Sequence, residues 1–134
     1  MIIIDASVAT KLINIQEEGS EKAFELLKKH TEGDEDILVL PLLFLEVANA
    51  LATKSHMSQP EITRGIDFLY NATFLVHEVT KENIQDAASL AKQYKTSVYD
   101  MLYAVIAKER KCVLLTADTK FVSKTKFTFV KPLL

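Results

Sequence analysis

The chain has 134 residues, of which 49% are hydrophobic and 25% are charged, with three glycines and three prolines. This composition predicts one compact globular domain over residues 1–134 and excludes a disordered or collagen-like chain. The net charge of −2 gives no global attraction to nucleic acid, so binding of nucleic acid would require a local basic patch or bound cations. No segment is long and apolar enough for a membrane span. The single cysteine, Cys112, excludes an internal disulfide, and with no secretory signal it favours a cytoplasmic protein.

The first expected element is a short strand that ends in a carboxylate. Ile2 to Ile4 form a continuous β-branched run, which is typical of a strand buried on both faces at the centre of a parallel sheet. In open α/β sheets, ligands bind beyond the carboxyl ends of the strands. Asp5 lies at that position and is the first candidate site residue, although a turn or helix-capping role fits it equally well.

Helical and strand patterns then alternate along the chain. Helices are predicted over residues 6–15, 20–30, 42–54, 58–70, 80–94 and 97–110, with a short helical turn at 120–124 and with Ser7 as a possible cap of the first helix. Strands are predicted at 37–40, 74–76, 113–116 and 127–129, and the last of these alternates as an edge strand does. The order predicts an α/β fold with a parallel sheet of four to five strands, with strand one central.

One carboxylate stands out on an otherwise apolar helix. Glu46 is the only charged residue between Ile37 and Thr53, and Asn49, three residues later, shares its face. A lone carboxylate on a buried helix is costly unless it has a partner or a metal. A narrow solvent-facing stripe is the alternative interpretation.

Two further acids follow similar patterns. Asp100 opens a mostly apolar helix, and its spacing from Ser97 also fits a reciprocal cap. Asp118 follows a short aliphatic strand, as Asp5 does, and could equally cap the next turn. Thr116 lies two residues earlier and could face the same way. Four acids in such positions favour a shared divalent cation, because Mg²⁺ and Mn²⁺ prefer hard oxygen ligands.

At this point the chain resembles the PIN-domain family, in particular its VapC-type toxin subgroup. The matching pieces occur in family order over nearly the whole chain: residues 1–7, Pro41 with 46–51, 99–107, and 114–118 with Phe121. The resemblance implies a three-layer fold with helices on both sides of the sheet. It also implies a metal-dependent ribonuclease site built from Asp5, Glu46, Asp100 and Asp118.

The resemblance further implies roles and partners. Mg²⁺ or Mn²⁺ would be held by the four acids, while Thr116, Asn49 and, more weakly, Ser7 would orient ligands or substrate. The substrate would be single-stranded or looped RNA, and the protein would be the homodimeric toxin of a type II toxin–antitoxin pair. An antitoxin would cover apolar residues of the N-terminal helices, which are equally suited to a core or a dimer interface: Leu12, Ile15, Leu43, Phe44, Phe68 and Leu69.

Two other functional classes remain open. One is a PIN-fold nuclease of RNA maturation or decay, which growth arrest on expression would distinguish from a toxin. The other is a non-catalytic α/β binding module, such as a receiver-like phospho-acceptor. A receiver would need adjacent acids after the first strand, and the run from Asp5 to Ser7 contains only one. Basic side chains that could contact phosphate, each also compatible with an ordinary surface role, are Lys11, Lys54, Arg64, Lys120 and Lys124.

Overall fold

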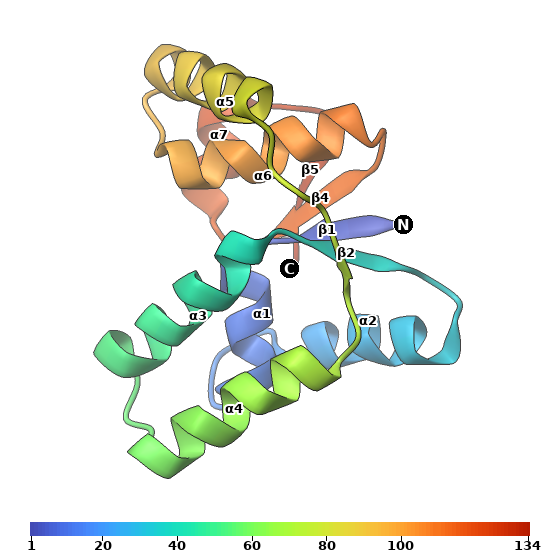
Figure 1. Cartoon of the computed structure of the whole chain (residues 1–134), viewed down its shortest axis with the longest axis vertical. Helices are drawn as coiled ribbons and strands as arrows, with labels where there is room; N and C mark the ends of the chain where they lie inside the picture. Colours follow the sequence, from blue (N-terminus) through green and yellow to red (C-terminus); the bar gives the residue numbers. More distant parts are fainter.

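A computed structural model describes all residues from Met1 to Leu134 as five strands and seven helices (Figure 1). In chain order they are β1 (Ile2–Ile4), α1 (Ala6–Ile13), α2 (Ser20–Glu32), β2 (Ile37–Val39), α3 (Pro41–Lys54), α4 (Gln59–Asn71), β3 (Leu75–Val76), α5 (Lys81–Tyr94), α6 (Val98–Glu109), β4 (Val113–Thr116), α7 (Thr119–Thr125) and β5 (Val130–Pro132). None of the helices is both long and apolar enough to cross a bilayer.

The strands form one parallel sheet in the order β3-β2-β1-β4-β5. The predicted α/β class, the five-stranded parallel sheet and the central position of the first strand are therefore confirmed. Figure 1 shows α1 to α4 on one side of the sheet and α5 to α7 on the other, which gives three layers. The central strand β1 is bonded to both β2 and β4, so the segment that follows it lies beside the segment that follows β4.

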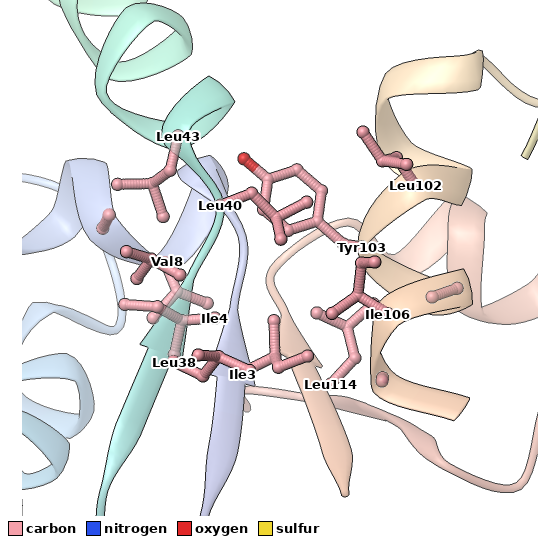
Figure 2. Close-up of a cluster of buried hydrophobic side chains, with 14 of the residues drawn as sticks. Ile3, Ile4, Val8, Leu38, Leu40, Leu43, Leu102, Tyr103, Ile106 and Leu114 are labelled. Atoms are coloured by element: carbon pink, nitrogen blue, oxygen red, sulfur yellow. The ribbon is translucent and has the colours of Figure 1, made fainter. Parts of the chain in front are cut away.

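The core explains why the first strand has no polar residue. Ile3 and Ile4 are at most 1% exposed, and they point to opposite faces of a sheet that is covered on both sides. Figure 2 shows Ile4 packed with Val8 and Leu43, and Ile3 nearer to Leu114. Burying an aliphatic side chain of this size contributes about 1.5–3 kcal/mol, so β1 is fixed firmly at the centre of the fold.

The prediction of a strand at residues 127–129 was wrong. The strand β5 begins at Val130, whose amide donates to the carbonyl of Phe127 across a turn. The rings of Phe127 and Phe129 stack at a centroid distance of 5.3 Å, and Phe127 also meets Tyr94 edge-on. Aromatic residues two apart mimic strand alternation, but here ring packing against α5 holds them in a turn.

Half of the apolar residues suggested for a partner surface belong to the core instead. Leu12, Leu43 and Leu69 are at most 4% exposed. By contrast, Ile15 is 60% exposed and Phe68 is 40% exposed. Helical spacing identifies an apolar face, but it does not say which of its members the neighbouring helix covers.

Candidate active site

The sheet topology brings Asp5 and Asp118 to one edge of the sheet. Asp5 directly follows β1, and Asp118 lies two residues beyond β4. These strands are parallel neighbours with Ile4 opposite Leu115, so their carboxyl ends meet. The helix α3 follows β2, the other neighbour of β1, and carries Glu46 to the same edge. Asp100 comes from the first turn of α6.

The four predicted acids line a single cavity of about 260 Å³. Its walls are formed by Asp5, Ala6, Ser7, Thr10, Glu46, Asn49, Ala50, Lys54, Asp100, Tyr103 and Asp118. The structure therefore brings together every predicted site residue except Thr116, which is buried beneath the cavity and bonded to Asp5. Asp5 and Asp118 are more than a hundred residues apart in the sequence, and the pairing of β1 with β4 brings them together.

Asp5 is both a helix cap and a cavity residue. Its Oδ1 accepts hydrogen bonds from the amides of Ser7 and Val8 and from the Ser7 hydroxyl, which makes Asp5 the N-cap of α1. The prediction that Ser7 caps this helix was therefore wrong, because Ser7 already lies in the first turn. The second oxygen, Oδ2, accepts only from the hydroxyl of Thr116. A carboxylate oxygen has two lone pairs, so Oδ2 keeps one for another ligand.

The hydroxyls of Ser7 and Thr116 join the two strand ends. The Ser7 hydroxyl accepts from the amide of Ala117 at 2.9 Å, and the Thr116 hydroxyl accepts from the amide of Asp118 at 3.0 Å. Asp118 in turn caps α7 by accepting from the amide of Phe121 at 3.1 Å. The capping interpretations of Asp5 and Asp118 are thus correct, and they are compatible with a place in the cavity.

Glu46 is held by a tyrosine from another helix. The hydroxyl of Tyr103 donates to Oε1 of Glu46 at 2.7 Å, across 57 residues of sequence. Figure 2 shows Tyr103 reaching from α6 with its hydroxyl oxygen directed towards the start of α3. Tyr103 is 1% exposed, so packing fixes its ring, and the bond fixes one oxygen of Glu46. The solvent-stripe interpretation of Glu46 does not account for this arrangement.

Asp100 shows only half of the predicted reciprocal cap. Its amide donates to the Ser97 hydroxyl at 3.0 Å. The returning bond, from the amide of Ser97 to the carboxylate, is absent, although the corresponding bonds are present at the starts of α4 and α5. The Asp100 carboxylate is therefore left to face the cavity.

The carboxylates that line the cavity repel one another. Burial raises the pKa of Asp5, Glu46 and Asp100 above their ordinary values, and the charge of Asp100 raises the pKa of both Asp5 and Glu46 further. Hydrogen bonds from hydroxyls lower each pKa only in part. None of the four acids takes part in an ion pair with a lysine, arginine or histidine. The uncompensated negative charge favours a bound cation.

The donor set fits a hydrated cation of the Mg²⁺ or Mn²⁺ type. All of the acidic donors are hard carboxylate oxygens, and Oδ2 of Asp5 and the second oxygen of Glu46 are available to a ligand. No three His, Cys, Asp or Glu side chains converge closely enough to hold an ion directly. Mg²⁺ normally keeps several waters and binds through one or two carboxylates, so this spacing suits contacts made partly through water.

The sequence did not predict the link between Tyr103 and Glu46, and it named Lys54 only as one of five basic side chains that could contact phosphate. For both Tyr103 and Lys54, the spacing along the helix places the residue near a predicted acid. Tyr103 follows Asp100 by three residues on α6, and Lys54 follows Glu46 by eight on α3, so each shares a face with a predicted acid. Thr10 was also missed, and its hydroxyl is bonded to the carbonyl of Ala6 within α1.

A larger hollow lies elsewhere. Its volume is about 760 Å³, and it lies between α5, α6 and the aromatic turn that includes Phe127 and Phe129. None of the four clustered acids lines it. The smaller cavity is the stronger candidate because convergent groups with raised pKa values mark functional sites better than volume does.

Comparisons with known proteins agree with this fold. The family model described as "PIN domain" matches residues 2–126. No curated protein matches the chain. Among solved structures, PAE2754 from Pyrobaculum aerophilum has a TM-score of 0.73 at 21% identity, covering 98% of this chain and 90% of its own.

Two other similar structures carry titles that mention toxins. A toxin-antitoxin complex from Klebsiella pneumoniae has a TM-score of 0.70 at 15% identity, covering 100% of this chain and 98% of that one. VapC20 from Mycobacterium tuberculosis, described as a Sarcin-Ricin loop cleaving toxin, has a TM-score of 0.71 at 12% identity, covering 93% and 95%. At these identities the three structures show a shared fold.

Proposed function

The chain belongs to the PIN-domain family, and from that premise we propose that it is a divalent-metal-dependent endoribonuclease that hydrolyses RNA phosphodiester bonds. One observation carries the proposal. Four carboxylates from separate segments line one cavity beyond the ends of parallel strands, and none of them has a cationic partner. Such repulsion would only destabilise a purely structural protein, whereas a metal-dependent nuclease needs clustered carboxylates to bind its metal.

Each side chain has a defined part in this proposal. Asp5, Glu46 and Asp100 would bind Mg²⁺ or Mn²⁺ directly or through water, with Asp118 completing the acidic wall. A bound divalent ion supplies charge neutralisation at the phosphate and a water of lowered pKa. Thr116 and Ser7 orient the Asp5 carboxylate through their hydroxyls. Asn49 is exposed on the cavity wall, where its amide can contact ligand or substrate.

The biological role proposed is that of the toxin in a type II toxin–antitoxin pair. The similar fold of the Klebsiella toxin-antitoxin complex and of the Mycobacterium toxin supports this role. Apolar side chains that the fold does not cover also lie on α3, on α4 and in the turn after α1: Leu45, Phe68, Tyr70 and Ile15, which are 70%, 40%, 63% and 60% exposed. Such a surface suits an amphipathic helix of an antitoxin or a second copy of the chain in a homodimer.

The activity is tested by cleavage of end-labelled single-stranded and stem-loop RNA with Mn²⁺, with Mg²⁺ and with EDTA. We expect cleavage only with metal, and we expect it to be lost in Asp5→Asn and in Asp100→Asn. Asn is also a good N-cap, so the first variant should keep α1 intact. Asp67→Asn is the matched control, because Asp67 is exposed on α4 and lies outside the cavity. Full activity in either active-site variant would contradict the assignment.

The toxin role needs a separate test. Induced expression of the wild-type chain in bacteria should arrest growth, and expression of Asp100→Asn should not. Cleavage in vitro without growth arrest would favour a nuclease of RNA maturation or decay instead.

A further inference from the structure

A second hollow adjoins the acidic cavity. It has a volume of about 200 Å³ and is lined by Ser7, Thr10, Lys11, Asn14, Glu17, Ala50, Lys54, Ser55 and Ala117. Four of these residues also line the acidic cavity: Ser7, Thr10, Ala50 and Lys54. The two hollows are therefore halves of one groove that runs between α1 and the C-terminal half of α3.

The charge changes sign along this groove. The acidic half contains four carboxylates, whereas the adjoining half contains Lys11 and Lys54 with a single acid, Glu17. Glu17 is already paired, because its carboxylate accepts from Lys11 at 3.3 Å. Lys54 has no ion-pair partner and is exposed in the last turn of α3. The free positive charge of the groove is thus located at the junction of its two halves.

An RNA chain is polyanionic, so its binding at an acidic site requires a nearby positive charge such as that of Lys54. The acids attract a divalent ion but repel every phosphate that the ion does not neutralise. Lysine is a flexible point charge with three donors, which suits a phosphate whose position varies. The side-chain amide of Asn14 in the same hollow offers hydrogen bonds to a nucleotide without adding negative charge.

We propose that the hollow around Lys54 binds the nucleotide next to the cleaved bond, with the ammonium of Lys54 contacting the flanking phosphodiester of a single-stranded RNA. This subsite rests on the proposed ribonuclease function and adds to it the path of the strand, which runs from the acids across Lys54 towards Asn14. Lys54 is a positioning residue in this account, because it contacts a phosphate that does not react.

The experiment measures RNA affinity as a function of salt. Fluorescence anisotropy with a labelled single-stranded RNA, in Ca²⁺ as an oxygen-preferring ion, gives Kd over a KCl series for the wild type, Lys54→Ala and Lys54→Arg. Lys22→Ala is the control, since Lys22 is exposed on α2 and lines neither hollow. We expect Lys54→Ala to weaken binding by roughly threefold to tenfold and to flatten the slope of log K against log salt by about 0.7, the value for one phosphate contact on a single strand. Lys54→Arg should restore both values.

Cleavage with Mn²⁺ provides the second measurement, in which Lys54→Ala should raise KM while kcat stays near the wild-type value. Equal salt slopes for Lys54→Ala and Lys22→Ala would overturn the subsite, as would a wild-type chain that binds no RNA. The proposed function fails separately, if the wild type binds RNA but never cleaves it. A Lys54 that served only to stabilise the end of α3 would change the melting temperature and leave the salt slope unchanged.

Discussion

The hydrogen bond between Tyr103 and Glu46 can be tested by removing one oxygen atom. Tyr103→Phe keeps the buried ring and deletes the hydroxyl that donates to Glu46 at 2.7 Å. A hydrogen bond to a charged group contributes about 1.5–3 kcal/mol when both partners are buried. Glu46 lines an open cavity and is only half-buried, so water can replace the bond on its side. We therefore expect a loss of about 1 kcal/mol.

This loss should depend on pH in a definite direction. The bond from Tyr103 lowers the pKa of Glu46, although burial leaves that pKa raised above the ordinary value of 4.5. Without the hydroxyl, the pKa of Glu46 rises further. When folding raises the pKa of an acid, the folded protein loses stability as the pH rises from the unfolded pKa through the folded pKa. The variant, in which the pKa of Glu46 is higher, should therefore lose more unfolding free energy than the wild type. The difference should be small near pH 4.5 and should grow as the pH rises above that value.

The assay is urea unfolding in EDTA near pH 4.5, the ordinary pKa of a glutamate, and at about pH 8. For 134 residues, an unfolding entropy of about 2.1 cal/mol/K per residue converts 1 kcal/mol into a melting shift of about 3–4 °C. Tyr70→Phe is the matched control, because Tyr70 is 63% exposed and its hydroxyl makes no hydrogen bond within the chain. Equal losses at both pH values, or a loss no greater than in the control, would refute the reasoning.

Three further predictions concern the same edge of the sheet and one helix contact. Burial raises the pKa of Asp5, so the metal-free wild type should lose stability as the pH rises above about 4. Asp5→Asn should lessen that loss in a urea-unfolding pH series. Parallel plots of unfolding free energy against pH for the two proteins would argue against this prediction. Thr116→Val should cost about 2–3 kcal/mol in the same assay, because it removes the donor to Asp5 and strands the amide of Asp118, whereas Thr116→Ser should cost less. Gly65→Ala should lower the melting temperature, because the alanine Cβ would lie 2.3 Å from a methyl carbon of Ile13. Overpacking of this kind costs about 1–3 kcal/mol. An unchanged melting temperature would show that α1 and α4 can separate freely.

Much of the architecture follows from local pattern. The run from Ile2 to Ile4 predicted a buried central strand, and the structure places it between β2 and β4. Helical spacing of apolar residues, helix-forming composition and capping patterns together located all seven helices, because these signals depend on short segments of the chain. The aromatic pair at Phe127 and Phe129 misled the same reasoning, since a period of two is shared by a strand and by two rings stacked across a turn.

The acids of the candidate site were also recognisable in the sequence. Asp5 and Asp118 each end an apolar strand, and Glu46 stands alone on a buried helix, so the cost of burying their charge marked them before any contact was known. What the sequence could not determine was which other residues touch them.

Those contacts depend on the tertiary structure. Only the pairing of β1 with β4 brings the Thr116 hydroxyl to Asp5, across 111 residues. Only the packing of α6 against the sheet brings Tyr103 to Glu46. The sequence determined each residue's local environment because burial and periodicity are properties of short segments. The tertiary structure alone decided the partners, because a hydrogen bond acts over about 3 Å and that distance is set by the assembly of all three layers.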